Sequence, residues 1–171
     1  VEAAVARAVE DLGGFRSIVQ PGDTVLVKPN LLVASPPEKA VTTHPEVVRA
    51  VVAGCQEAGA EVWVGDSPGF GSSARVAERC GIMDVCRDTG ARFVPFTGGK
   101  PTSYPEGRVA KSFVLADPVA RADKVISVAK LKTHGLMLYT GAVKNLYGTI
   151  AGIEKARLHA TYQSPAAFGR M

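Results

Sequence analysis

Apolar positions along the chain follow two periods, which predicts alternating helices and strands. Apolar residues at helical spacing predict helices at residues 2–12, 45–58, 73–79 and 83–89, with a helical turn at 117–122. Short apolar or β-branched runs predict strands at residues 24–28, 61–64, 92–96 and 124–128. Residues 97–107 are rich in Gly and Pro and predict a loop, whereas residues 109–115 could form an edge strand.

This alternation is typical of a three-layer α/β sandwich with a largely parallel sheet. Right-handed crossovers would then place helices on both faces of the sheet. The chain contains neither G-x-G-x-x-G nor G-x-x-x-x-G-K-[ST]. We therefore expect a Rossmann-like fold without a dinucleotide fingerprint or a P-loop, organised as one α/β domain over residues 1–171.

Three of the predicted strands end directly in polar residues. Lys28-Pro29-Asn30 follows the first strand, Asp66-Ser67 follows the second, and Lys130 to His134 follows the strand at 124–128. Ligands of open α/β sheets bind beyond the carboxyl ends of the strands. If these strands are parallel, the three polar segments share one edge of the sheet and predict a binding crevice there.

The residue types in these segments suit the binding of an anion and the transfer of a proton. Lys28, Lys130 and Lys132 could form a cationic floor, because each ammonium offers three donors. His134 is the best acid or base, because the pKa of histidine lies near neutrality. Asp66 could orient a lysine, hold a metal or accept a proton.

A further helix is expected to begin near Thr140, because Ala142, Val143, Leu146 and Tyr147 would share one face. Its amino-terminal N–H groups would then be available to an anion.

Each feature also has a purely structural interpretation. A lysine at a strand end is usually solvated, and Asp66 could simply cap a turn. His44, which precedes Pro45, fits a helix-entry residue better than a metal ligand, because no second ligand lies at metal spacing. Asn145 could be a hydrogen-bonding residue on a helix face. The coincidence of three polar strand ends favours a site.

Composition and charge narrow the class of partner. The net charge is +4, and the segment from Lys124 onward holds seven Lys and Arg but one acid, which favours an anionic ligand. Aromatic residues make up 6% and no nucleic-acid motif is present, which argues against nucleic acid. No apolar run approaches the ~20 residues of a membrane span, so no membrane is expected.

Three widely spaced cysteines form no metal or cluster motif, and they fit a reducing cytoplasm. Cys55 and Cys80 are expected inside helices as small apolar residues.

Five ordered motifs resemble the domain of unknown function 362 family, which includes many proteins described as iron–sulfur cluster-binding. The motifs are Val27-Lys28-Pro29-Asn30, Thr43-His44-Pro45, Gly65-Asp66-Ser67-Pro68-Gly69, Lys130-Leu131-Lys132-Thr133-His134 and Thr140-Gly141-Ala142-Val143-Lys144-Asn145-Leu146-Tyr147-Gly148. His159, after Lys155, also fits, although taken alone it would be expected at the surface. The resemblance implies an α/β domain.

Some members of that family carry a ferredoxin-like module for [4Fe–4S] clusters and are thought to be redox proteins or reductases. The family domain usually continues into a strand and an acidic, glycine-rich motif, which this sequence lacks. We therefore expect an incomplete amino-terminal part of the family domain. Because the cysteines form no cluster-binding run, no cofactor is expected within this chain, and a [4Fe–4S] cluster would come from a partner or a missing segment.

The leading hypothesis is a redox-associated enzyme domain that binds a small anionic substrate at the strand ends and receives electrons from a ferredoxin-like partner. The alternative is a non-catalytic anion-binding module, or an interaction module of a larger complex, with assembly into an oligomer left open. The predicted catalytic residues are His134, Lys132 and Asp66. The predicted substrate-binding residues are Lys28, Asn30, Ser67, Lys130, Thr133, Thr140, Lys144 and Asn145, and no metal ligands are predicted.

Overall fold

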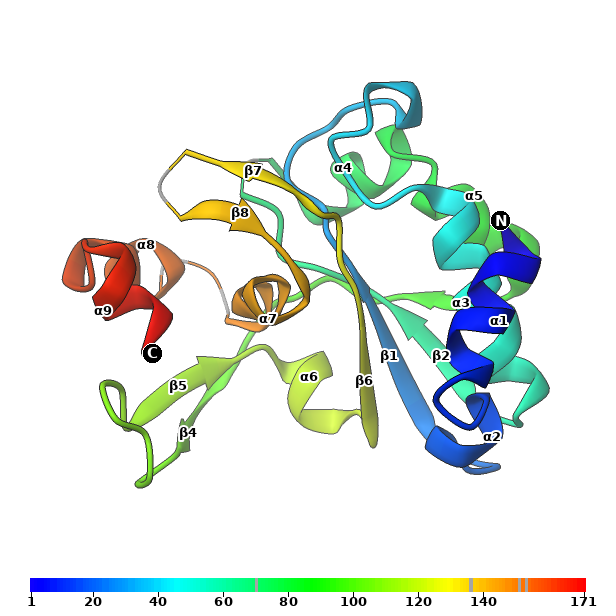
Figure 1. Cartoon of the computed structure of the whole chain (residues 1–171), viewed down its shortest axis with the longest axis horizontal. Helices are drawn as coiled ribbons and strands as arrows, with labels where there is room; N and C mark the ends of the chain where they lie inside the picture. Colours follow the sequence, from blue (N-terminus) through cyan, green and yellow to red (C-terminus); the bar gives the residue numbers. More distant parts are fainter. Residues whose placement is uncertain (70, 136, 151, 153) are drawn as a thin grey trace.

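The computed structural model describes residues 1–171 except residues 70, 136, 151 and 153. Its centre is a four-stranded sheet in the order β3 (Arg92–Phe93), β2 (Glu61–Val64), β1 (Thr24–Pro29) and β6 (Lys124–Val128). All three strand pairs are parallel. Helices flank this sheet (Figure 1), so the predicted α/β sandwich with a parallel, Rossmann-like sheet is confirmed.

Further elements surround the sheet. The α-helices are α1 (Glu2–Glu10), α2 (Phe15–Ile18), α3 (Pro45–Glu57), α4 (Ser73–Arg79), α5 (Ile82–Thr89), α6 (Asp117–Arg121), α7 (Ala142–Asn145), α8 (Glu154–Thr161) and α9 (Pro165–Gly169), with 3-10 helices at Pro37–Lys39 and Leu146–Thr149. Two antiparallel pairs complete the described part of the fold: β4 (Lys100–Ser103) with β5 (Ser112–Leu115), and β7 (Lys132–His134) with β8 (Leu138–Thr140).

The pleat of β1 divides the core into two clusters. Val25 and Val27 point to one face, where the buried side of α3 packs against them. Leu26 points to the opposite face and packs with Trp63 and Phe96. Side chains alternate along a strand, so Lys28 lies on the same face as Leu26. The polar end of β1 is therefore directed to the side of the sheet on which α7 lies (Figure 1).

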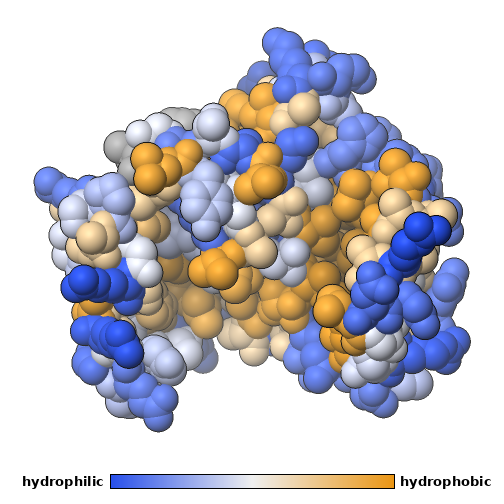
Figure 2. Space-filling view, viewed as in Figure 1, coloured by the Kyte–Doolittle hydropathy of each residue, from blue (hydrophilic) through white to orange (hydrophobic). Residues whose placement is uncertain are grey.

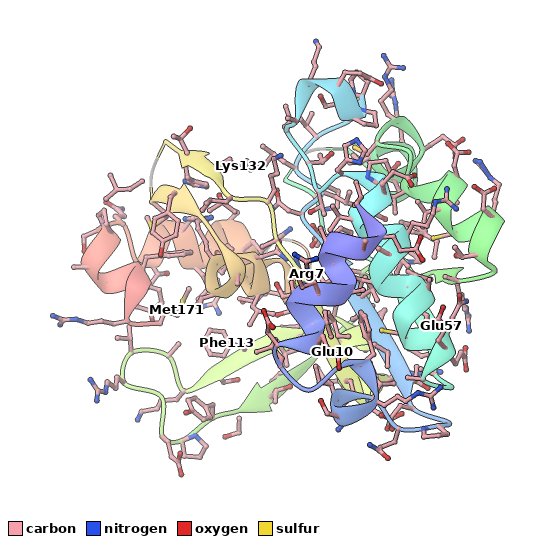
Figure 3. The ribbon with its side chains drawn as sticks, turned by 45° about the vertical axis from the view of Figure 1, so that its right-hand side comes forward. Arg7, Glu10, Glu57, Phe113, Lys132 and Met171 are labelled. Atoms are coloured by element: carbon pink, nitrogen blue, oxygen red, sulfur yellow. The ribbon has the colours of Figure 1, made fainter. Side chains whose placement is uncertain are left out.

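The helices of the first face form a separate layer. Figure 3 shows α1, with Arg7 and Glu10, in front of α3, which ends at Glu57. The amino-terminal end of α3 has two helix-start devices: Pro45 lies in its first turn, and His44 Nδ1 accepts a hydrogen bond from Glu46 N at 3.3 Å. His44 thus acts as a helix-entry residue, as the sequence indicated.

Several predicted elements differ from the structure. β3 ends at Phe93 rather than residue 96, because Val94 and Phe96 turn into the second core cluster. Within the predicted loop at 97–107, β4 forms an edge pair with β5; its side chains are exposed, so no apolar pattern marked it. The helix α4 begins at Ser73 as predicted, and its cap is Ser72, whose Oγ accepts from Arg75 N.

The prediction of a helix from Thr140 is wrong in the helix's extent and in the face that it buries. Thr140 ends β8, and α7 begins at Ala142 and has only four residues before a 3-10 turn. Val143 is 86% exposed, so the predicted apolar face does not pack on the core. The expectation that the N–H groups at this helix start bind an anion stays a prediction.

Cys55, Cys80 and Cys86 are buried. Burial raises the pKa of Cys55 to about 12 and that of Cys86 to about 11, so neither is a thiolate near neutral pH. In the part of the chain that the structure describes, no helix combines the length and the hydropathy needed to cross a membrane.

Candidate functional site

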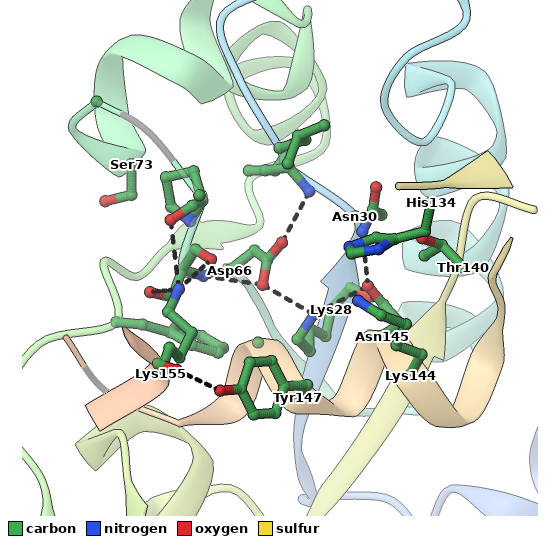
Figure 4. Close-up of a pocket in the computed structure, with 18 of the residues that line it drawn as sticks. Lys28, Asn30, Asp66, Ser73, His134, Thr140, Lys144, Asn145, Tyr147 and Lys155 are labelled. Atoms are coloured by element: carbon green, nitrogen blue, oxygen red, sulfur yellow. Dashed lines mark hydrogen bonds and ion pairs between the residues drawn. The ribbon is translucent and has the colours of Figure 1, made fainter. Parts of the chain in front are cut away.

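A pocket of about 990 Å³ lies beyond the carboxyl ends of β1 and β2, the position that the strand ends predicted (Figure 4). The hairpin β7–β8, the turn from α7 into the 3-10 helix, and α8 supply the other walls. Its titratable lining residues are Lys28, Asp66, Lys132, His134, Lys144, Tyr147, Lys155 and His159. Four lysines thus surround one carboxylate among the described lining residues, and the pocket is strongly cationic.

The pocket floor is a buried ion pair between the ends of neighbouring strands. Lys28 Nζ lies 2.8 Å from Asp66 Oδ1, and the two residues are 0% and 3% exposed. The same ammonium donates to Asn145 Oδ1 at 3.1 Å and to Pro29 O at 3.3 Å. An ammonium has three N–H donors, so Lys28 has an acceptor for each of them.

Two competing effects act on the pKa of Lys28. Burial lowers it, and the neighbouring carboxylate of Asp66 raises it by a smaller amount. Asp66 is itself held by the backbone, because it accepts from Leu31 N at 2.7 Å and from Ser67 N at 2.8 Å. Lys28 and Asp66 therefore organise the floor, and the roles predicted for them on a ligand stay predictions.

Asn145 fixes the orientation of Asn30. Asn145 Nδ2 donates to Lys28 O at 3.1 Å and to Ser127 Oγ at 3.0 Å, and its Oδ1 accepts from Lys28 Nζ. The amide of Asn145 thus has one consistent orientation. Asn30 must then present its nitrogen to Asn145 Oδ1, at 3.2 Å, which directs Asn30 Oδ1 elsewhere.

Asn30 Oδ1 is buried and has no hydrogen-bond partner among the described residues. A buried unpaired acceptor costs ~1–3 kcal/mol, so a donor at this oxygen would stabilise the protein. Asn30 lines the pocket, and a ligand hydroxyl, a ligand amine or a water molecule would supply such a donor.

Gly148 allows the turn after α7 to approach the ion pair. A Cβ at this position would lie 2.6 Å from Asp66 Oδ1 and 2.8 Å from Lys28 Nζ, which is too close for any side chain. The glycine belongs to the motif that begins at Thr140, but the sequence interpretation gave it no role. Its position in that motif offered no sign of contact with residues far away in the chain.

Lys155 lies at the end of the pocket away from His134, and the sequence analysis did not predict it as a site residue. Its Nζ donates to Ser67 Oγ at 2.6 Å, to Ser67 O at 2.8 Å and to Pro68 O at 3.3 Å (Figure 4). Tyr147 Oη donates to the backbone oxygen of Lys155, and burial raises the pKa of Tyr147 to about 12. Lys155 therefore connects α8 to the polar end of β2.

The remaining cations gather at the end of the pocket formed by the β7–β8 hairpin and α7. Lys132 Nζ donates to Val41 O at 2.6 Å, whereas Lys144 has no acceptor among the described residues. Burial, followed by the charges of Lys144 and Lys130, lowers the pKa of Lys132, and burial lowers that of Lys144. Lys130 lies outside the described pocket lining, so the structure does not bring it into the predicted cationic floor.

His134 lies at this cationic end with a defined tautomer. Its Nδ1 accepts from Met137 N at 3.1 Å, so the neutral ring carries its proton on Nε2. Burial is the largest cause that lowers the pKa of His134, and the charges of Lys144, His159 and Lys132 lower it further.

His159 is a second histidine of the pocket, although taken alone it was expected at the surface. Its ring stacks on Phe168 at 4.6 Å between centroids, and Tyr147 meets it edge-on at 5.0 Å. Burial and then the charge of Lys144 lower the pKa of His159. Its fit to the family pattern was the one sequence signal that could have found it.

The other predicted binding residues are distributed as follows. The pocket is lined by Asn30, Ser67, Thr133, Thr140 and Asn145. Thr140 and Asn145 are buried, Thr133 is exposed, and Ser67 is engaged by Lys155. Among the described residues no group of three or more His, Cys, Asp or Glu side chains could hold a metal ion.

The fold and the pocket define an α/β protein with a cationic crevice at the carboxyl edge of a parallel sheet. The chain belongs to the family described as Domain of unknown function (DUF362), whose model matches residues 25–171. The resemblance seen in the five motifs is thereby confirmed.

A thylakoid-associated protein of Synechocystis sp. is 39% identical over 170 residues, which span 99% of this chain and 52% of the relative. The chain therefore spans about half the length of the curated relative it matches. Comparison with solved structures finds no significant match.

Proposed function

We propose that the crevice binds a small anionic substrate and that the domain is part of an enzyme. The observation that carries this proposal is the excess of cations: four lysines line the pocket, and its one described carboxylate is paired with Lys28. Lys144 and Lys132 are the anion-binding residues in this proposal, because their ammonium groups keep donors beyond those used in the protein.

His134 is the proposed residue that donates or accepts a proton. Its neutral ring carries the proton on Nε2, and its neighbours Lys132 and Lys144 would hold the anion next to it. His159 is a second candidate for the same role. Asp66 acts in this proposal through Lys28 and the backbone, as an orienting residue of the floor.

Electron transfer is proposed from the family resemblance alone. The substrate would be reduced by electrons from a ferredoxin-like partner or an iron–sulfur module outside these residues, while the pocket supplies positive charge and a proton. Anaerobic purification followed by iron analysis and absorption spectroscopy of a mixture with a reduced ferredoxin tests this part. Failure of every small anion to accelerate ferredoxin oxidation would refute it.

The proposal of an anion site is tested with sulfate, phosphate and succinate. Calorimetry measures their affinity, and thermal unfolding measures their effect on stability. We expect saturable binding that weakens as salt rises, because ion pairs are screened. Lys144→Gln should lower the affinity at least about tenfold, since a charge-assisted hydrogen bond contributes ~1.5–3 kcal/mol. Lys130→Gln is the matched control because Lys130 lies outside the described lining. Equal losses in both variants would refute the proposal.

A second candidate, a non-catalytic module of a larger complex, is favoured by one surface. Leu131, Leu138, Tyr139 and Val143, on the β7–β8 hairpin and α7, are 77%, 78%, 62% and 86% exposed. Figure 2 shows apolar patches over these elements. Contiguous exposed apolar surface is typical of interaction sites. This candidate would be favoured if His134→Gln still binds anions and neither the wild type nor the variant converts a substrate in the ferredoxin assay.

We also propose a cytoplasmic location, because the cysteine pattern fits a reducing compartment. The competing proposal is an association with thylakoids, as the name of the relative states for that protein. Fractionation of cells that express the tagged protein decides between them: recovery with membranes after low-salt washes would refute the cytoplasmic location.

A further inference from the structure

Lys144 differs from the other lysines of the pocket in the surroundings of its amine. Lys28 has three acceptors, Lys155 has three, and Lys132 donates to Val41 O. The described residues provide no acceptor for Lys144 Nζ, although its side chain is half-buried in the pocket wall. A lysine held in a pocket without a carboxylate partner is not explained as a structural ion pair.

The ionisable side chains that interact with Lys144 are all basic. Lys132, His134 and His159 all interact electrostatically with it, and the described carboxylate of the pocket, Asp66, is paired with Lys28. In Figure 4, His134 and Lys144 lie at the same end of the pocket and come from β7 and α7. Burial lowers the pKa of Lys144, which raises the share of the neutral, nucleophilic amine, while the protonated form still binds anions.

We infer that Lys144 is a nucleophile that forms an imine with a small anion carrying a carbonyl group, such as a 2-oxo acid. The inference rests on the proposed anion site and names the substrate class for it. Lys132 would hold the carboxylate of the substrate, and its positive charge would also keep the pocket selective for anions. The carbonyl carbon would then lie within reach of Lys144 Nζ.

The step balances without a cofactor or an oxidant. The lone pair of neutral Lys144 Nζ attacks the carbonyl carbon, the C–O π bond opens, and one proton passes from Nζ to the oxygen, which gives a carbinolamine. The remaining Nζ proton then passes to the hydroxyl as the C–O bond breaks and the C=N bond forms, and His134 Nε2–H donates a hydrogen bond to the departing oxygen. The products are the neutral imine and water.

Trapping with sodium cyanoborohydride and pyruvate tests this inference. Cyanoborohydride reduces an imine to a stable secondary amine, which intact-mass analysis detects and peptide mapping locates. We expect one adduct, on the peptide that contains Lys144. Lys144→Arg should abolish the adduct while sulfate still raises the unfolding temperature, because arginine keeps the charge but does not form this imine.

Lys130→Gln is the control and should retain the adduct at Lys144. An adduct that is spread over exposed lysines, or that persists in Lys144→Arg, overturns the inference, and so does the absence of an adduct with both pyruvate and 2-oxoglutarate. If sulfate stabilises the wild type in that case, the anion site stands and only the imine is refuted. If sulfate and the 2-oxo acids all fail to bind, both proposals fail.

Discussion

The buried ion pair Lys28–Asp66 gives the sharpest test of how the site is built. Asp66→Asn removes the negative charge and one acceptor oxygen but keeps the size of the side chain. The carboxylate accepts from Lys28 Nζ, Leu31 N and Ser67 N, and an amide oxygen cannot serve all three donors. The variant therefore removes the counter-charge of a buried ammonium and leaves at least one backbone N–H without its acceptor.

The expected cost follows from the burial of the pair. Removing one partner of a buried ion pair typically costs ~3–5 kcal/mol, and at 0% and 3% exposure solvent compensates very little. Natural domains unfold with ~5–15 kcal/mol, so this one change would remove about a fifth of the total or more. The midpoint of thermal unfolding should fall by ~6–20 °C.

Urea unfolding, followed by circular dichroism and fluorescence of Trp63, measures the free energy of unfolding. Glu78→Gln is the matched control, because it breaks an ion pair with Arg87 whose side chains are about half exposed; we expect ~0–1 kcal/mol. The double variant Lys28→Met/Asp66→Asn should recover part of the loss, since no buried charge then lacks a partner. A cost for Asp66→Asn no larger than that for Glu78→Gln would refute the role assigned to the pair.

Three other changes probe separate parts of the pocket. Gly148→Ala should cost ~1–3 kcal/mol in urea unfolding, because its Cβ would lie 2.6 Å from Asp66 Oδ1; an unchanged midpoint would show that the turn moves freely. Malate should bind up to ~10-fold more tightly than succinate, because its hydroxyl can donate to the unpaired Asn30 Oδ1, and equal affinities in calorimetry would exclude that contact. The lowered pKa values of His134 and His159 mean that the unfolded chain binds more protons below pH 6.5, so stability should fall as pH drops through that window. Replacing both histidines with Gln should flatten this profile, and an unchanged slope would assign the pH dependence to other groups.

The sheet and its polar edge were predictable because local patterns encode them. The apolar runs at residues 24–28, 61–64 and 124–128 match β1, β2 and β6 closely, and Lys28 and Asp66 lie at the edge that their strands indicated. By contrast, β4 was missed because its exposed residues carry no apolar period, and α7 was misjudged because Val143 is apolar yet exposed.

The roles within the site depended on contacts that sequence spacing does not contain. One of the three acceptors of the Lys28 amine is Asn145, which is 117 residues away in the chain. Lys155 and His159 come from a segment with weak periodicity, and they enter the pocket because Tyr147 and Phe168 pack around them. The sequence therefore indicated where the pocket would lie. It did not indicate which lysine amines would be hydrogen-bonded by other residues of the protein.

The long separation between Lys28 and Asn145 has a kinetic consequence. Contacts between distant parts of a chain form only after the entropy of closing a large loop has been overcome, so the pocket floor should assemble late in folding. A ligand that binds the finished floor would stabilise contacts that are absent from the folding transition state. Such a ligand would slow unfolding while leaving the folding rate nearly unchanged, and it would extend the lifetime of the protein rather than speed its formation.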